Sequence, residues 1–347
     1  MQVTLSTMET LVDDVGSFPL PLGFDRQTFS RAYRLSKDAY INGVTIREDS
    51  FLWENFGKPT LDAFKSKLQT GLDVTNYPQQ YDGIKQVSDA VHLAMEKGSF
   101  LVDDKDAFLP EVRLIHDEAK CLSEESGEKI RLRVSIFGPL EHYLKEMGTV
   151  VYDEILDNYA ETIHRFAKNS ILETKYVKTE VISIDEPSYG FLNIDAGKEK
   201  IVKVLEKAFD FHGPVRQVHL HSPVRLPDLL SVKNIDVVSF EYASSPKNIE
   251  PVSRRMLDES DKYIRVGISR TDIDSIIAEL HDKGIAKPME EQIVEDENII
   301  RKRFLVAKEK YGERMAFTGP DCGLGSWPSQ EAALLLLKRT VKAVKKV

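Results

Sequence analysis

Residues 315–328 read Met-Ala-Phe-Thr-Gly-Pro-Asp-Cys-Gly-Leu-Gly-Ser-Trp-Pro, an apolar run followed by a turn rich in Gly and Pro. Such a run predicts a buried strand that opens into a loop. The loop carries an acid and a thiol, Asp321 and Cys322, and a thiol placed there is reachable. A single cysteine is also commonly a small buried hydrophobe. Its surroundings in the fold therefore decide what Cys322 does.

Short apolar runs of this kind alternate with longer amphipathic segments along almost the whole chain. Because apolar residues recur there at spacings of three and four, helices are predicted for segments such as 151–170, 198–210, 291–311 and 330–346. Strands are predicted at residues 11–16, 72–75, 132–137, 181–184, 215–219, 237–240, 264–268 and 315–318.

This alternation of strand and helix predicts an α/β protein built as a single (β/α)8 TIM barrel. A doubly wound sheet is the alternative, and it is weakened because no glycine fingerprint follows the first strand. We expect one catalytic domain over residues 1–347, with helical decorations after the first two strands. Residues 23–70 are polar-aromatic and helix-prone, which suggests a helical insertion over one mouth of the barrel.

Composition and charge exclude several classes of protein. The formal net charge is −9, with basic residues scattered apart from a short Lys-rich tail, which argues against nucleic-acid binding. The two cysteines imply no disulfide framework, the N-terminus does not resemble a signal peptide, and no apolar stretch is long enough for a membrane span. We therefore expect a cytoplasmic protein.

Polar residues follow most of the predicted strands. In a (β/α)8 barrel the loops after the strands meet at one face, so these residues should lie near one another. They are Ser17, Gln79, Asp185, Glu186, His219, His221, Glu241, Asp321 and Cys322.

Four of these residues have the side chains of metal ligands. His219 and His221 are two apart, so on a strand both project from one face. Glu241 follows four apolar residues, where a carboxylate is costly unless it is paired or bound to a metal. With Cys322 they form a mixed N, O and S donor set that suits zinc better than calcium or magnesium. Hydrogen-bonded barrel histidines and a salt bridge for Glu241 are the structural alternatives.

A metal-independent acid/base pair is a further possibility for the carboxylates. Asp185 and Glu186 stand together where the fourth strand ends, and a glycosidase, for example, needs two carboxyl groups that flank its substrate. That interpretation would leave His219, His221 and Cys322 without a role.

Several short sequence motifs, taken in chain order, resemble those of the C-terminal catalytic barrel of the cobalamin-independent methionine synthase family. The resemblance spans nearly the whole chain and implies a stand-alone version of the core, without the N-terminal second barrel of the larger enzymes. The motifs that carry it are Val15-Gly-Ser-Phe-Pro19, Gly71-Leu-Asp-Val74, Gly138-Pro139, Ile184-Asp-Glu-Pro187, His219-x-His221, Ser239-x-Glu241, Pro320-Asp-Cys-Gly-Leu324 and Trp327-Pro328.

The resemblance implies that zinc is held by His219, His221, Glu241 and Cys322. It further implies that Asp185, with Glu186, Gln79 and the Ser17 region, binds the substrate amino acid, and that Glu241 and Asp185 serve catalysis. Three departures stand out: His221 replaces a cysteine of the family, no tryptophan follows Gly138-Pro139, and no histidine follows the seventh strand.

The resemblance, read with these departures, implies a zinc-dependent methyltransferase that converts homocysteine to methionine. Because the missing tryptophan and histidine belong to folate binding in the family, we expect a methylcorrinoid or its carrier protein as methyl donor. Alternatives are an alkyltransferase for another small thiol, such as coenzyme M, and a zinc-binding partner subunit without activity of its own.

Overall fold

The computed structural model describes residues 9–192 and 194–345 of the chain, so the expected domain limits at residues 1 and 347 lie outside the described residues. All eight predicted strands are present within it. They are β1 (Leu11–Val12), β2 (Thr75–Asn76), β3 (Ile130–Phe137), β4 (Val177–Asp185), β5 (Val215–Leu220), β6 (Val237–Phe240), β7 (Tyr263–Ser269) and β8 (Met315–Pro320).

The strands form one parallel sheet in the order β1-β8-β7-β6-β5-β4-β3-β2. The sheet curls so that its two edges meet: Asp13 bridges to Val74 in parallel, and the Asp73 N–H donates to the Val12 carbonyl at 2.8 Å. Strand neighbours that follow the chain order around a ring are those of a TIM barrel. This confirms the predicted fold and excludes the doubly wound sheet.

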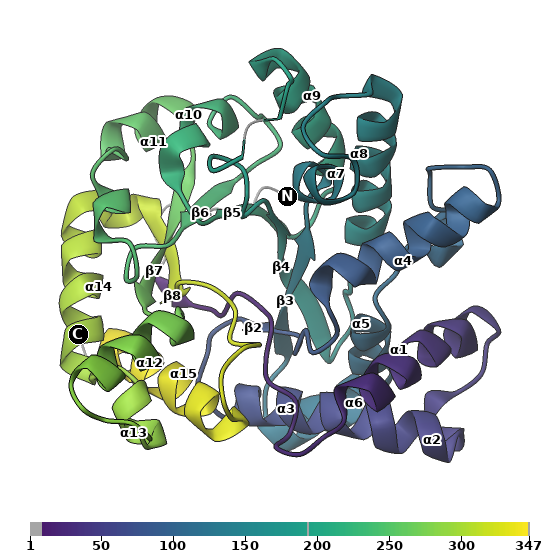
Figure 1. Ribbon diagram of the computed structural model, residues 1–347, viewed down its shortest axis with the longest axis horizontal. Coiled ribbons are helices and arrows are strands. Elements are labelled where there is room, and N and C mark those ends of the chain that lie inside the picture. The colour runs from purple at the N-terminus through teal and green to yellow at the C-terminus, as the bar shows by residue number, and fades with distance from the viewer. Residues whose placement is uncertain (1–8, 193, 346–347) are drawn as a thin grey trace.

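Helices surround the strands on all sides (Figure 1). They bury their apolar faces against the outside of the sheet, as in other barrels of this kind. Their bounds are α1 (Arg26–Ile41), α2 (Ser50–Leu52), α3 (Lys58–Leu68), α4 (Gly83–Glu96), α5 (Pro110–Asp117), α6 (Ala119–Ser126), α7 (Pro139–Met147), α8 (Asp153–Lys168), α9 (Lys198–Ala208), α10 (Leu226–Leu229), α11 (Arg254–Ser260), α12 (Ile273–Asp282), α13 (Glu290–Ile293), α14 (Glu297–Tyr311) and α15 (Gln330–Lys345).

Several predicted boundaries differ from the structure, among them those of the strands expected over 11–16 and 72–75. The helix expected over 291–311 is divided into α13 and α14, because Asp296 is extended and its side chain accepts the Asn298 N–H as an N-terminal cap. Residue 346, the predicted end of the last helix, lies outside the described residues. None of the described helices is both long and apolar enough to cross a bilayer.

The segment 23–70 contains α1, α2, the π-helix η2 (Trp53–Gly57) and α3. These helices lie beside α5 and α6 at the lower right of Figure 1. Aromatic packing holds the segment together: Phe56 is fully buried between Phe29 and Tyr33, and the Tyr33 ring stacks on Tyr81 with centroids 4.0 Å apart.

Candidate metal centre

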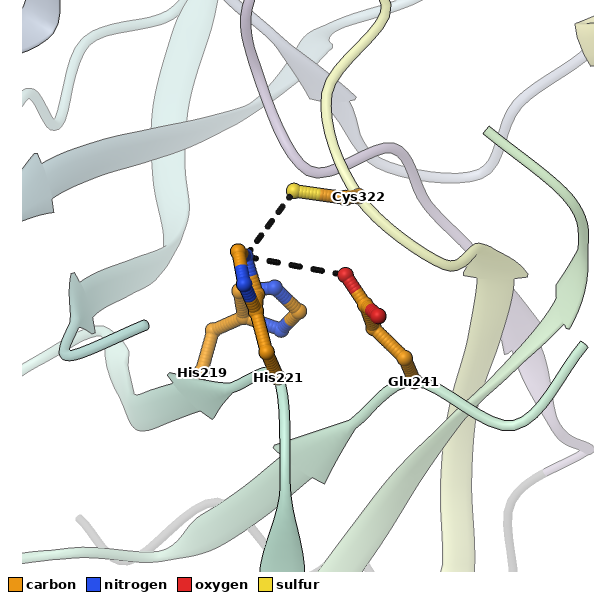
Figure 2. A group of neighbouring side chains, drawn as sticks. All are labelled: His219, His221, Glu241 and Cys322. Atoms are coloured by element: carbon orange, nitrogen blue, oxygen red, sulfur yellow. Dashed lines mark hydrogen bonds and ion pairs between the residues drawn. The ribbon is translucent and has the colours of Figure 1, made fainter. Parts of the chain in front are cut away.

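Four side chains with metal-binding atoms converge at the C-terminal ends of three strands. His219 is in β5, His221 directly follows β5, Glu241 directly follows β6, and Cys322 lies just after β8. One ligand atom from each lies within 4.8 Å of the others. Figure 2 shows the four side chains pointing toward one another.

The two separations measured from His221 fit tetrahedral coordination. Ligand atoms about 2.0–2.3 Å from a zinc ion at tetrahedral angles are about 3.3–3.7 Å apart. His221 Nε2 lies 3.5 Å from Cys322 Sγ and 3.6 Å from Glu241 Oε1. The donor set of two imidazoles, a thiol and a carboxylate is also one that zinc accepts. The residues therefore fit a metal of this kind.

A hydrogen bond at one ring nitrogen orients the His219 side chain. Its Nδ1 lies 3.1 Å from Ser239 Oγ, which the register of β5 and β6 places directly opposite. Its Nε2 is buried and has no hydrogen-bond partner among the described residues. A buried polar atom without a partner is costly, and a metal ligand that donates its other nitrogen to a neighbour is a frequent arrangement.

We expect Ser239→Ala to lower zinc affinity by about tenfold to a hundredfold, since losses of that size follow when the partner of a metal-bound histidine is removed. Competition with a chromophoric chelator measures the affinity. Ser231→Ala is the matched control, because Ser231 Oγ donates only to the Pro227 carbonyl on the exposed side of α10. Equal affinities in both variants would show that Ser239 does not orient His219.

The backbone that carries His221 and Glu241 is fixed by one amide. Asn248 Nδ2 donates to the His221 carbonyl at 2.8 Å and to the Glu241 carbonyl at 2.9 Å. Asn248 thus joins the ends of β5 and β6 directly beneath the two ligands. It lies in the short 3-10 helix η5 (Pro246–Ile249), a segment of ordinary composition, and nothing in the sequence singles it out.

Asp321 fixes the loop that follows Glu241. Its carboxylate is fully buried and accepts the backbone N–H groups of residues 242–244 at 2.6–2.9 Å. Gly267 provides the room, because a Cβ atom there would come 2.2 Å from Asp321 Oδ1. The residue beside Cys322 therefore positions the loop of Glu241 on the neighbouring side of the site.

Burial shifts the pKa values of the four potential ligands in the direction that favours their uncharged forms. It raises the pKa of Cys322 to about 12, with Glu241 adding to the effect, and it raises the pKa of Glu241 to about 8, with Asp321 adding to it. It lowers the pKa of His221, and that of His219 well below its usual value. A cation at the centre would favour the charged thiolate and carboxylate instead.

Asp185, for which the sequence predicts a role in substrate binding, lies next to this cluster. It ends β4 and is paired in register with His219 on β5. It is 7% exposed, and Ser183 Oγ donates to its Oδ1 at 2.5 Å. Burial raises the pKa of Asp185 to about 7. An ammonium group bound beside it would favour the carboxylate form.

The Glu186 carboxylate forms its hydrogen bonds within the protein. It is fully buried, and its two oxygens accept the backbone N–H groups of Leu140 and Glu141 in the first turn of α7, at 3.0 and 2.6 Å. A Cβ atom at Gly138 would come 2.1 Å from Glu186 Oε1, so glycine is needed there. The structure therefore places this carboxylate at the N-terminus of α7, with both oxygens in use.

Ser17 and Gln79 lie on the loops after β1 and β2. A Cβ atom at Gly16 would be 3.1 Å from Gln79 Oε1. Gln79 Nε2 donates to Gln86 Oε1 at 2.9 Å. Ser17 Oγ accepts the Gly325 N–H at 3.2 Å, which ties the first loop to the loop that carries Cys322.

Comparison with known proteins gives similarity at the level of the fold. No family model matches the chain, and no curated protein matches it. A B12-independent methionine synthase from Shewanella sp. W3-18-1, solved in complex with selenomethionine, matches with a TM-score of 0.57 and 12% identity, over 98% of this chain and 98% of that chain. A proposed vitamin-B12-independent methionine synthase from Listeria monocytogenes matches with a TM-score of 0.54 and 14% identity, over 98% and 99%.

Likeness at this identity shows the fold alone. The assignment to the cobalamin-independent methionine synthase family, made from the sequence motifs, is therefore wrong as a statement about sequence family, because no family model supports it. The chain shares its barrel with these two structures, and its chemistry has to be argued from its own residues.

Proposed function

We propose that this protein is a zinc-dependent methyltransferase that methylates the sulfur of a small thiol, with homocysteine as the thiol and methionine as the product. The observation that carries the proposal is the group His219, His221, Glu241 and Cys322, whose ligand atoms lie within 4.8 Å of one another beside Asp185. Two solved structures with this fold bear the name of B12-independent methionine synthases, and one of them holds selenomethionine.

The donor set suits zinc in charge as well as in geometry. Two neutral imidazoles, one thiolate and one carboxylate carry two negative charges, which balance a divalent cation. A bound zinc ion would supply a stabilised substrate thiolate at neutral pH, where a free alkyl thiol is mostly protonated.

Glu241 is the ligand that we expect substrate sulfur to replace. Its oxygen is the hardest donor of the four, and a borderline metal prefers sulfur to it. Ser244 Oγ lies 3.3 Å from Glu241 Oε2 and can hold the released carboxylate. The Glu241 and His221 side chains are 17% and 36% exposed, so a substrate can reach this side of the cluster.

Asp185 is the group that we expect to bind the substrate ammonium. Asp185→Asn keeps the size of the side chain and removes its charge, and the loss of a charge-assisted hydrogen bond costs about 1.5–3 kcal/mol. The KM for homocysteine should therefore rise roughly tenfold to a hundredfold. Asp210→Asn, an exposed site after α9, is the matched control. An unchanged KM in Asp185→Asn would assign Asp185 a structural role.

A methylcorrinoid or its carrier protein is the proposed methyl donor. A pterin ring would need an exposed aromatic surface, but residues 139–144, which follow β3, are all buried. Ser269, the last residue of β7, is buried against Thr340, and Arg270, which follows it, is paired with Asp272 and Glu279. Neither loop offers a ring for stacking.

The test is turnover by the zinc-reconstituted chain, with methylcobalamin or methyltetrahydrofolate as donor and homocysteine or coenzyme M as acceptor. We expect methionine from methylcobalamin and homocysteine, and little or none from methyltetrahydrofolate. Turnover of coenzyme M alone would change the assigned thiol. Turnover with the folate alone would overturn the donor, and no turnover with any pair would favour a partner subunit without activity of its own.

A further inference from the structure

A cleft between α1 and α4 lies outside the metal centre and has a lining of its own. Its volume is about 350 Å³, which is in the range of pockets for small molecules. All its lining residues belong to these two helices, which are on the right of Figure 1. Leu35 and Leu93, which are 39% and 53% exposed, provide an apolar part of the lining.

The charges in the cleft are mainly positive. Arg31, Arg34 and Lys37 come from α1 at a spacing of three residues, and Lys85 comes from α4. Asp38 and Asp89 are the acids of the lining, which leaves an excess of two positive charges in a protein whose net charge is −9. The Asp89 carboxylate already accepts the Tyr81 hydroxyl at 2.5 Å.

None of the four cations forms an ion pair with the described part of the chain. The guanidinium of Arg31 lies over the Phe51 ring at 5.3 Å, and Arg34 Nη1 reaches the Tyr81 hydroxyl only at 3.5 Å. Lys37 Nζ is buried against aromatic rings and has no hydrogen-bond partner among the described residues. Like charges at neighbouring positions of a helix repel one another.

A second cavity, of about 400 Å³ beside the N-terminal ends of β2 and β3, shows that this pattern is not general. It also has four cationic side chains in its lining, and each of them is paired with an acid. The pairs are Lys65–Glu125 (2.8 Å), Lys129–Glu173 (2.6 Å), Arg131–Glu180 (3.6 Å) and Lys345–Asp73 (2.8 Å).

We propose that the cleft between α1 and α4 is a binding site for a small polyanion, a phosphate ester or a polycarboxylate with an apolar part. The unpaired guanidinium groups and the ammonium of Lys85 supply charge and hydrogen-bond donors, and Arg in particular matches phosphate and carboxylate geometry. Leu35 and Leu93 contact the apolar part of the ligand. The site is separate from the metal centre and does not depend on the proposed reaction.

The experiment is calorimetric titration of the full chain with pyrophosphate and, separately, with tricarballylate. These probes distinguish a phosphate from a polycarboxylate ligand. The variants are Arg34→Glu and Lys85→Glu, with Lys203→Glu as the matched control. Lys203 is exposed on α9 and likewise has no ion pair in the described part of the chain, so its reversal changes net charge equally.

We expect at least one probe to bind, with affinity that falls as salt is added. Arg34→Glu and Lys85→Glu should each weaken binding roughly tenfold or more, which corresponds to the loss of one charge-assisted contact, and Lys203→Glu should bind as the unchanged protein does. Any metal chelation by the probes affects all variants alike. Equal weakening in all three variants, or no binding of either probe at millimolar concentration, would overturn the proposal.

Discussion

Cys322→Ser should lower the affinity for zinc by more than about a hundredfold. Removal of a residue that only orients a ligand costs about tenfold to a hundredfold, and a direct ligand should cost more. The serine hydroxyl stays protonated at neutral pH, so the site loses both a soft donor and one negative charge. Elemental analysis after reconstitution under reducing conditions gives the stoichiometry, and chelator competition gives the affinity.

Cys121→Ser is the matched control for this change. Cys121 is exposed on α6, where its Sγ donates to Glu125 at 3.2 Å. This variant should retain one zinc per chain. Reconstituted protein without zinc, or a Cys322→Ser variant that binds zinc as tightly as the Cys121→Ser control, would contradict the assignment of the metal centre.

The group of four potential metal ligands could be predicted because its residues obey local rules. Each ligand lies at the end of a strand that is recognisable as an apolar run, and a barrel brings such ends to one face. The pair His219 and His221 needs only the two-residue period of a strand. Donor types and strand ends together were therefore sufficient to select four residues from a chain of 347.

The supporting contacts of the ligands could not be found in this way, although Asp321 itself was among the polar residues at the strand ends. Asn248 acts through two backbone carbonyls, and Asp321 acts through backbone N–H groups on a different strand end. Such contacts depend on the three-dimensional path of the loops, which leaves no periodic signal in the sequence. Glu186 is the opposite case. Its position beside Asp185 suggests a substrate-binding residue, but both of its oxygens accept hydrogen bonds from the first turn of α7.

The first strand is shorter than predicted, for a related reason. The apolar run predicted over 11–16 contains two acids, Asp13 and Asp14, and both are buried. The strand β1 itself covers only Leu11–Val12. Asp14 Oδ2 lies 2.6 Å from Lys67 Nζ, and Asp13 is paired with Arg133 and Arg265. These basic partners are far away in sequence. The sequence alone therefore does not show that the two buried acids have counter-charges in the folded barrel.

Asp13→Asn should therefore be one of the most destabilising single changes in this chain. Asp13, Arg133 and Arg265 are all fully buried. Arg133 Nη1 donates to Asp13 Oδ2, and Arg265 Nε donates to Asp13 Oδ1 at 2.6 Å. Removing the shared carboxylate leaves two guanidinium groups without their counter-ion in the barrel interior, and breaking a buried pair in this way costs about 3–5 kcal/mol.

Urea unfolding of both proteins measures the change in the free energy of unfolding. Asp153→Asn is the matched control, since Asp153 is 74% exposed and lies 3.5 Å from Lys200, where loss of the pair should cost less than about 1 kcal/mol. Arg265 Nη2 also donates to the Pro320 carbonyl at 2.9 Å, at the end of β8 and two residues before Cys322. Destabilisation should thus reach the metal centre, and the Asp13→Asn variant should bind zinc more weakly than Asp153→Asn. A free energy of unfolding within about 1 kcal/mol of the unchanged protein would contradict the role of Asp13 as the counter-ion of these arginines.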